Sequence, residues 1–236
     1  LTKSFIGHTL SAMKALVITG GEGPPLDFLL RLAADSGLII AADSGLHLAE
    51  EASIEPDYII GDFDSIDSED RLGKYDKRHI IKYPVLKDDT DTELALDLAK
   101  RSGANYTRIA GGGGGRLDHL LAVFRLFSRD DPPREWHISR DSAFLLEAGE
   151  TMSFHALPGS RVSVFSLGEE SSGMESQGLA WPLSGLVWGP GRFGVSNVAT
   201  EGSFSLKAGS SRLLVILPID FEGFGKDVPR IARILD

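Results

Sequence analysis

The sequence predicts a mixed α/β fold in two parts: an N-terminal parallel-sheet α/β domain over residues 14–140, then a C-terminal antiparallel β-sandwich domain over residues 141–236. Two observations lead to this prediction. Up to about residue 129, short apolar runs alternate with segments of helical spacing, which is typical of strand–helix–strand units with right-handed crossovers. Beyond residue 141 the helical spacing disappears, and short alternating runs bounded by glycine and serine replace it.

The first domain is expected to consist of buried strands with amphipathic helices between them. Apolar runs flanked by turn residues predict strands at 15–19, 38–42, 58–60, 79–83 and 106–110. Helical faces are marked by Leu26, Leu29, Leu30 and Ala33, by Leu94 and Leu98, and by Leu117, Leu120, Leu121 and Phe124. A further strand at 136–139 is expected to belong to the same sheet.

The second domain shows only strand-like patterns. They predict strands at 145–146, 152–155, 162–167, 178–182, 204–206 and 213–217. Residues 226–235 are expected to form a short helix or an irregular tail. Residues 1–13 are kept out of the fold prediction, because MKALVITGG from Met13 reads as a first strand and the residues before it read as an extension.

Composition excludes several classes of function. The chain has 236 residues, 42% of them hydrophobic and 25% charged, so it can bury an ordinary globular core. Its net charge of -10 argues against binding to nucleic acid. The absence of cysteine excludes disulfides, thiolate zinc sites and cysteine nucleophiles, and six scattered histidines argue against a transition-metal site. Without a roughly 20-residue apolar run or a signal peptide, we expect a cytoplasmic protein that does not contact membranes.

Two aspartates follow the expected strand 58–60. Asp62 and Asp64 are two residues apart, so an extended segment would point both carboxylates to the same side. Parallel sheets bind ligands beyond the carboxyl ends of their strands, and paired carboxylates at that edge favour a cation. A lone Asp-x-Asp is more often a turn that caps the next helix, so this motif needs support from elsewhere.

A second acidic segment, residues 87–93, leads into the helix expected near Leu94. Thr90 and Glu93 have the spacing of a capping box, which explains those two residues without a ligand. Residues 88–93 contain four acids, whereas a helix cap requires only one carboxylate. One of the remaining acids could therefore be a metal ligand.

Five consecutive glycines, 111–115, connect the expected strand 106–110 to a helix. Glycines there let backbone N–H groups approach an anion at the helix N-terminus, and Arg116 can bind phosphate through two of its guanidinium nitrogens. The segment is neither a Walker P-loop nor a dinucleotide fingerprint, because no Gly-Lys-Ser/Thr follows it and the third glycine of GxGxxG is missing. Carboxylates suited to Mg²⁺ together with this loop predict a nucleotide-phosphate transferase, without naming the acceptor.

These motifs resemble the thiamine pyrophosphokinase family in order and spacing, over about residues 14–217. The N-terminal segments that carry the resemblance are 41–45 (AADSG), 56–65 (PDYIIGDFDS), 88–94 and Gly-Gly-Arg116-Leu117-Asp118-His119. The C-terminal segments are 178–183 (GLAWPL) and 195–197 (VSN). The chain departs from the family pattern at Ser44, His47 and Val198.

The resemblance implies an ATP-binding catalytic domain and a thiamine-binding sandwich, working as a homodimer with the thiamine site at the subunit interface. The implied reaction transfers the diphosphate of ATP to the thiamine hydroxyl and yields thiamine diphosphate and AMP, with Mg²⁺ as cofactor. The implied metal ligands are Asp62, Asp64 and Asp91, and the implied nucleotide contacts are Asp43, Thr90, Gly112, Gly113, Gly114, Gly115 and Arg116. The implied thiamine contacts are Asp118, Trp181, Ser196 and Asn197, and the implied catalytic residues are Asp62, Asp64, Asp91 and Asp118.

Several alternatives stay open at this level. Either Asp91 or Asp118 could orient or deprotonate the hydroxyl, whereas His119 is more simply a structural residue. Trp181 has the residue type of a sandwich core as much as of a cation-binding face. A related diphosphokinase acting on a hydroxymethylpterin would not need the C-terminal pocket, and a non-catalytic nucleotide or thiamine sensor would not need the intact acids.

Overall fold

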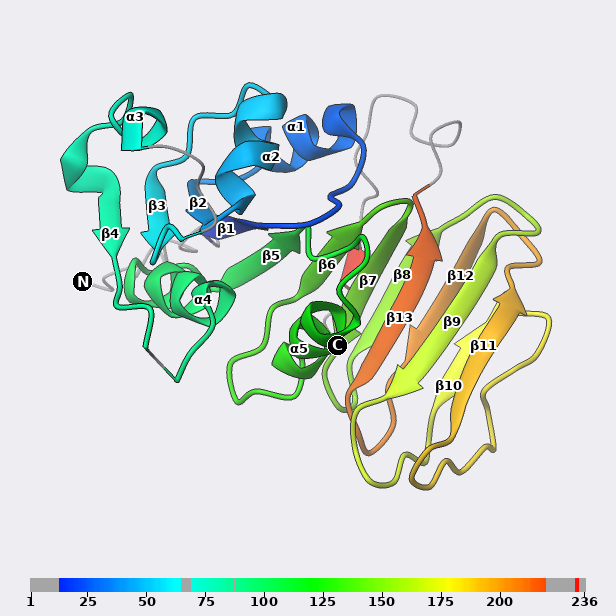
Figure 1. Cartoon of the computed structure of the whole chain (residues 1–236). Coiled ribbons are helices and arrows are strands. Elements are labelled where there is room, and N and C mark those ends of the chain that lie inside the picture. Colours follow the sequence, from blue (N-terminus) through cyan, green and yellow to red (C-terminus); the bar gives the residue numbers. More distant parts are fainter. Residues whose placement is uncertain (1–12, 65–68, 87, 220–231, 234–236) are drawn as a thin grey trace, which may run out of the picture.

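The computed structural model describes residues 13–64, 69–86, 88–219 and 232–233. Within those residues, the strands form one ten-stranded mixed sheet and one four-stranded antiparallel sheet, with helices on both faces of the parallel half (Figure 1). The large sheet continues from the α/β part into the sandwich part, so the domain division after residue 140 stays a prediction. No helix in the described part of the chain is long and apolar enough to cross a membrane.

The parallel half contains the strands predicted from the apolar runs, in the order β6-β5-β1-β2-β3-β4. They are β1 (Lys14–Thr19), β2 (Leu38–Ala42), β3 (Tyr58–Gly61), β4 (Ile80–Lys82), β5 (Tyr106–Ala110) and β6 (Glu135–Ile138). All neighbours within this group pair in parallel. The central strands are continuous apolar runs because helices cover them on both sides.

The helices lie in two layers (Figure 1). One face carries α1 (Leu26–Ala34), α2 (Gly45–Glu51) and α3 (Glu69–Leu72), and the other carries α4 (Asp91–Arg101) and α5 (Leu117–Leu126); a 3₁₀ turn, η1 (Lys77–His79), precedes β4. Leu16 and Ile18 of β1 belong to the core formed with α1, whereas Ala15 and Val17 belong to the core formed with α4 and α5. Alternate residues of β1 thus pack against helices on opposite faces of the sheet.

The carboxyl ends of the parallel strands share one edge of the sheet. The helices that follow the neighbouring strands β1 and β5 lie on opposite faces, so their loops diverge there. Such a switch point is the usual ligand crevice of an open α/β sheet.

The sandwich extends the large sheet by antiparallel strands. Beyond β6 lie β7 (Asp141–Leu146), β13 (Leu213–Pro218), β9 (Arg161–Ser166) and β11 (Phe193–Val198), in that order. The second sheet has the order β10 (Glu175–Gln177), β12 (Ser203–Lys207), β8 (Thr151–His155) and β14 (Ala232–Arg233). An apolar core fills the space between the sheets, and within it the rings of Phe154 and Phe204 stack 4.9 Å apart.

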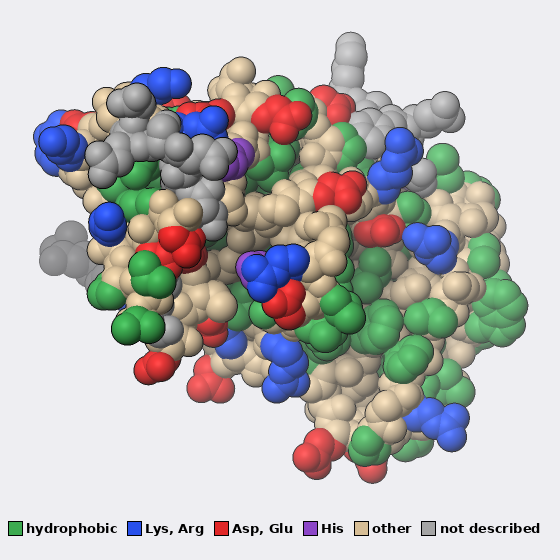
Figure 2. Space-filling view, viewed as in Figure 1, with side chains coloured by type: hydrophobic (Ala, Val, Ile, Leu, Met, Phe, Trp, Pro, Cys, Tyr) green, Lys and Arg blue, Asp and Glu red, His purple; other side chains and the backbone are tan. Residues whose placement is uncertain are grey.

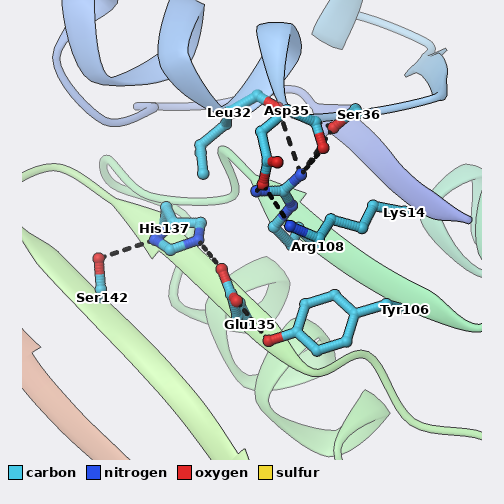
Figure 3. A network of polar contacts seen from close by, with 9 residues as sticks. All are labelled: Lys14, Leu32, Asp35, Ser36, Tyr106, Arg108, Glu135, His137 and Ser142. Carbon is cyan, nitrogen blue, oxygen red and sulfur yellow. Dashed lines mark hydrogen bonds and ion pairs between the residues drawn. The ribbon is translucent and has the colours of Figure 1, made fainter. Parts of the chain in front are cut away.

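A buried polar network joins β5, β6, β7 and α1 (Figure 3). His137 Nδ1 lies 2.7 Å from Ser142 Oγ, and His137 Nε2 lies 2.9 Å from Glu135 Oε2. The Tyr106 hydroxyl donates to the other oxygen of Glu135. Arg108, only 2% exposed, pairs with Asp35 at 3.0 Å. Charged groups in a dry interior persist only when partners satisfy them, and these contacts supply partners for Glu135, His137 and Arg108.

Two predictions about local structure need correction or remain open. The prediction of a strand at 178–182 is wrong. Gly178 has a φ of +76°, and Leu179 forms an isolated β-bridge with Ala199 instead of a continuous strand. The described part of 226–235 is the short strand β14; the rest of that segment, and the extension expected before Met13, lie outside the described residues.

Candidate active site

Three carboxylates meet at the carboxyl ends of β2 and β3. Asp43 follows β2, Asp62 and Asp64 follow β3, and one carboxylate oxygen of each lies within 4.8 Å of the others. The sequence predicts Asp62 and Asp64 as cation ligands and Asp43 as a nucleotide contact; the structure places all three together. Charges of one sign at this separation repel each other unless a cation lies between them.

Turns, not an extended segment, bring these carboxylates together. Phe63 and Asp43 have φ values of +66° and +45°, in the left-handed region. The Asp64 N–H donates to Asp62 Oδ1 at 3.2 Å, and the Asp43 N–H donates to the Ile60 carbonyl at 2.8 Å. The expected extended conformation of residues 62–64 is therefore wrong, although the carboxylates still converge.

The donor set fits the Mg²⁺ that the sequence predicts. Asp43 Oδ1 is buried and has no hydrogen-bond partner among the described residues. A buried carboxylate oxygen without a donor is costly, and a cation satisfies it. Carboxylate oxygens are the ligands that Mg²⁺ prefers.

Thr90 and Asp91 stand at the start of α4. Thr90 Oγ1 accepts from the Glu93 N–H at 3.3 Å, and Glu93 Oε2 accepts from the Thr90 N–H at 2.8 Å, which confirms the capping box. Thr92 Oγ1 lies 2.7 Å from Thr19 Oγ1, so the N-terminus of α4 is at the same sheet edge as the three acids. As far as the described residues go, Asp91 is not part of the three-acid group, and its role as a ligand stays a prediction.

The glycine loop after β5 is bonded to the loop after β1. Gly113 and Glu22 exchange two backbone hydrogen bonds, of 3.1 and 2.9 Å, and Gly112 N–H donates to the Gly20 carbonyl at 2.9 Å. Gly111 has a φ of +105°, and a Cβ there would lie 2.1 Å from the Thr19 carbonyl oxygen, so this position requires glycine.

These bonds change the expected phosphate site. The N–H groups of Gly112 and Gly113 are used within the chain, as is that of Gly111, which donates to the His137 carbonyl at 3.1 Å. The N–H groups that remain for an incoming phosphate are those of Gly114, Gly115 and the N-terminus of α5, which no side chain in the described part of the chain caps.

Arg116 and Asp118 form an exposed ion pair beside this helix N-terminus. Arg116 Nε donates to Asp118 Oδ1 at 3.2 Å, and a terminal nitrogen donates to Oδ2 at 2.6 Å. The Arg116 hydrogen bond, followed by the His119 N–H and nearby positive charge, lowers the pKa of Asp118 to about 2. Asp118 is thus ionised at any physiological pH, and it accepts both hydrogen bonds from the Arg116 guanidinium beside the helix N-terminus.

Asp118→Asn is expected to lower kcat/KM for phosphate transfer at least tenfold, because Arg116 loses its orienting partner. The folded pKa is depressed, so protonation of Asp118 begins only well below neutral pH. The loss should therefore be the same at about pH 5 and at about pH 8. A loss confined to the higher pH would instead show that Asp118 titrates as a base in this range.

A cavity of about 540 Å³ opens at the same edge, on the α1 and α2 side. The loop after β1, the first two turns of α2 and the turn after β6 line it. Sequence reasoning missed this cavity. Gly20–Pro25 follows a strand but matches no phosphate motif, and the turn at Ser139 and Arg140 is distant in sequence.

The segment that carries the three acids and the glycine loop also matches a known protein family. Residues 29–132 match the family described as "Thiamin pyrophosphokinase, catalytic domain". This segment of the chain is a thiamin pyrophosphokinase catalytic domain. No curated protein sequence matches the chain.

Solved structures named as thiamin pyrophosphokinases share the fold. The Geobacillus thermodenitrificans structure is 27% identical, with a TM-score of 0.72, over 90% of this chain and 100% of that chain. The Bacillus subtilis structure is 22% identical, with a TM-score of 0.72, over 88% and 100%. The yeast structure is 17% identical, with a TM-score of 0.69, over 91% and 88%. The catalytic-domain match includes Asp43, Asp62, Asp64, Asp91, Asp118 and Arg116, but it ends before the sandwich.

Three of the four predicted thiamine contacts, Trp181, Ser196 and Asn197, lie around the edge strand β11, whereas Asp118 lies in the first turn of α5. Trp181 is 62% exposed, and Ser196 is exposed with a φ of +60°. Asn197 is buried, and its side chain binds the backbone of the loop that contains Trp181. Its Oδ1 accepts from the Trp181 N–H at 3.1 Å, and its Nδ2 donates to the Trp181 carbonyl at 2.6 Å. Asn197 therefore positions the loop that presents Trp181, which is a structural task in addition to the predicted contact.

The structure does not bring this edge to the three acids of the same chain. In the large sheet, β11 and β3 are separated by eight strand-to-strand steps. At about 4.8 Å per step, these strands are roughly 38 Å apart. Side chains on β11 and after β3 of one chain thus cannot share a ligand.

Proposed function

We propose that this chain transfers the diphosphate of ATP to the hydroxyl of thiamine, producing thiamine diphosphate and AMP. The observation that carries the proposal is the convergence of Asp43, Asp62 and Asp64 at the sheet edge that also carries the glycine loop and Arg116, within a catalytic domain of this family. The cytoplasmic location expected from the sequence remains a prediction.

The acids and the loop divide the work of phosphate binding. Asp43, Asp62 and Asp64 would hold Mg²⁺, which when bound neutralises charge on the phosphates. Gly114, Gly115 and the N-terminus of α5 offer N–H donors, and Arg116 offers a planar pair of donors to the group in transfer. Positioning and charge stabilisation are therefore the main contributions of the protein.

The acceptor hydroxyl must reach the β-phosphorus in line with the departing AMP. The new oxygen–phosphorus bond forms as the bond between the α-phosphate oxygen and the β-phosphorus breaks, and the hydroxyl proton is released. Asp118, with its pKa of about 2, is a weak proton acceptor, so it is better suited to orient the hydroxyl than to deprotonate it. Asp91, at the start of α4, is the remaining candidate for accepting the proton.

We infer that the active unit is a homodimer in which one copy offers Trp181 and Ser196 to the acids of the other. The separation of about 38 Å within one chain supports this, because neither set can reach the other alone. Phe193 and Val195 on β11 are 52% and 54% exposed, and hydrophobic side chains gather over the sandwich end of the visible face (Figure 2). Exposed apolar clusters of this kind typically mark protein interfaces.

Mixed dimers test this arrangement. Asp64→Asn and Trp181→Ala are each expected to be nearly inactive alone, since each damages every site. Dimers reassembled from an equal mixture should recover about a quarter of wild-type activity, because half of them carry one intact site. Sedimentation of an active monomer would contradict the shared site, as would mixed dimers without recovery.

The acceptor is tested by offering Mg-ATP with thiamine or with a hydroxymethylpterin. AMP release that depends on thiamine is the expected result. Release with the pterin alone would assign a different acceptor, and ATP binding without turnover would indicate a sensor.

A further inference from the structure

The glycine loop has a buried side-chain partner that the phosphate chemistry described so far does not use. Trp136 of β6 is 5% exposed, and its Nε1 donates to the Gly111 carbonyl at 2.8 Å. We propose that Trp136 is a positioning residue for the diphosphate transfer, because this bond holds the loop in the conformation that binds phosphate. The inference rests on the proposed function and adds which side chain fixes the loop.

The loop needs constraints from outside, because glycine has more conformational freedom than any other residue. Residues 111–113 are buried, whereas residues 114–115 are exposed. Strand β6 binds both backbone polar groups of Gly111: the His137 carbonyl accepts from its N–H at 3.1 Å, and the Trp136 indole donates to its carbonyl. The first glycine is thus held on both sides, ahead of the N–H groups that remain for an anion.

The indole is itself held by the core on the α4 and α5 side of the sheet. Trp136 belongs to the same buried cluster as Val123 of α5, and the Phe127 ring, at the end of α5, lies 6.4 Å from the Trp136 ring between centroids. A Cβ on Gly112 would lie 3.3 Å from Val123 and 3.7 Å from Trp136 Nε1, so the loop backbone passes close to both side chains. Trp136 therefore connects the body of α5 to the loop that leads into that helix.

The energetic argument concerns the Gly111 carbonyl. Removing the indole N–H would take away the donor that the structure gives to this buried acceptor. A buried acceptor without a donor is costly, whereas water can satisfy the same carbonyl when the loop opens. The bond therefore raises the population of the closed loop, and the apparent affinity for phosphate scales with that population. Linkage requires the reverse as well: bound phosphate must stabilise the indole bond.

Two variants of the full-length chain separate the bond from ring packing. Trp136→Phe keeps an aromatic ring in the core and removes the N–H donor. Phe127→Leu is the matched control, because it reduces the contact between the same two rings and leaves the indole bond in place. Calorimetry measures the binding of Mg-tripolyphosphate, a probe with no base, sugar or acceptor. Melting curves and the KM values of ATP and thiamine are measured on the same preparations.

Trp136→Phe is expected to bind tripolyphosphate about tenfold more weakly and to raise the KM for Mg-ATP, with the KM for thiamine unchanged. Both variants lose buried ring contacts, so a lower melting temperature is expected for both. Phe127→Leu should nevertheless bind tripolyphosphate like the wild type. Wild-type binding by Trp136→Phe would overturn the inference, and an equal loss in both variants would do the same by reducing Trp136 to packing alone.

Hydrogen exchange of the indole N–H groups tests the linkage on the wild-type chain, without relying on a folded Trp136 variant. The chain has three tryptophans, at 136, 181 and 188, and their signals in ¹⁵N NMR spectra are assigned with Trp181→Phe and Trp188→Phe. Exchange at Trp136 should slow at least about fivefold when Mg-tripolyphosphate is bound, whereas exchange at the buried Trp188 should not change.

The exchange experiment also separates this inference from the proposed function. An active enzyme that binds tripolyphosphate with no change in exchange at Trp136 would overturn the role of Trp136 and leave the reaction in place. A folded wild-type chain that binds neither tripolyphosphate nor ATP would overturn the proposed function itself.

Discussion

Replacing Asp62 or Asp64 by asparagine is expected to lower turnover at least about a thousandfold, because the divalent cation loses a charged ligand. The thermal unfolding midpoint should stay near that of the wild type. Relief of repulsion among three carboxylates offsets the small loss of local hydrogen bonding at the Asp62 turn. Steady-state kinetics and a melting curve on the same preparations check both halves of this prediction.

Asp131→Asn is the matched control for these variants. Asp131 precedes β6, at the sheet edge opposite the three acids, and pairs with Lys100 at 3.0 Å on the surface. An exposed pair of this kind contributes little to stability, so this variant should behave like the wild type in both assays. Wild-type turnover by Asp62→Asn or Asp64→Asn would remove these residues from the metal site.

Glu135→Ala is expected to lower the free energy of unfolding by about 3–5 kcal/mol, the largest effect on stability that we foresee. The substitution leaves His137 and the Tyr106 hydroxyl without their acceptor in the interior (Figure 3). Urea unfolding measures the change. Glu175→Ala, which breaks an exposed pair with Lys207, is the control and should change the free energy by less than about 1 kcal/mol. Equal stability of the two variants would show that the network contributes nothing.

The network also predicts how stability depends on pH. Burial raises the pKa of Glu135, but hydrogen bonds from His137 and Tyr106 and nearby positive charge outweigh it, so the pKa is lower than its usual 4.5. A depressed folded-state pKa means that the contribution is present above the unfolded value and is lost as the pH falls through the folded value. Glu135→Ala should therefore lose less stability than the wild type on acidification below about pH 4.5.

Sequence patterns predicted the parallel half well because its signals are local. Buried strands there are continuous apolar runs, and the capping box at Thr90 and Glu93 is a contact between near neighbours. Asp62 and Asp64 were recognisable from their place after a strand. The conformation of their turn was not, because the positive φ of Phe63 depends on packing around the end of β3.

The sandwich and the cavity depend on contacts between distant parts of the chain. The β11 strand has a register shift between Gly194 and Asn197, which breaks the alternation by which strands are recognised. The segment 178–182 looks apolar enough for a strand, yet Asn197 holds it as a loop through side-chain hydrogen bonds. The cavity wall joins residues around 22, 47 and 140, which no spacing rule connects.

The transfer of an intact diphosphate is tested most directly by ³¹P NMR of the wild-type chain with Mg²⁺, ATP and thiamine. The account predicts that AMP and thiamine diphosphate appear in equal amounts while ATP disappears. Formation of ADP with thiamine monophosphate, or no consumption of ATP by a folded protein, would contradict it.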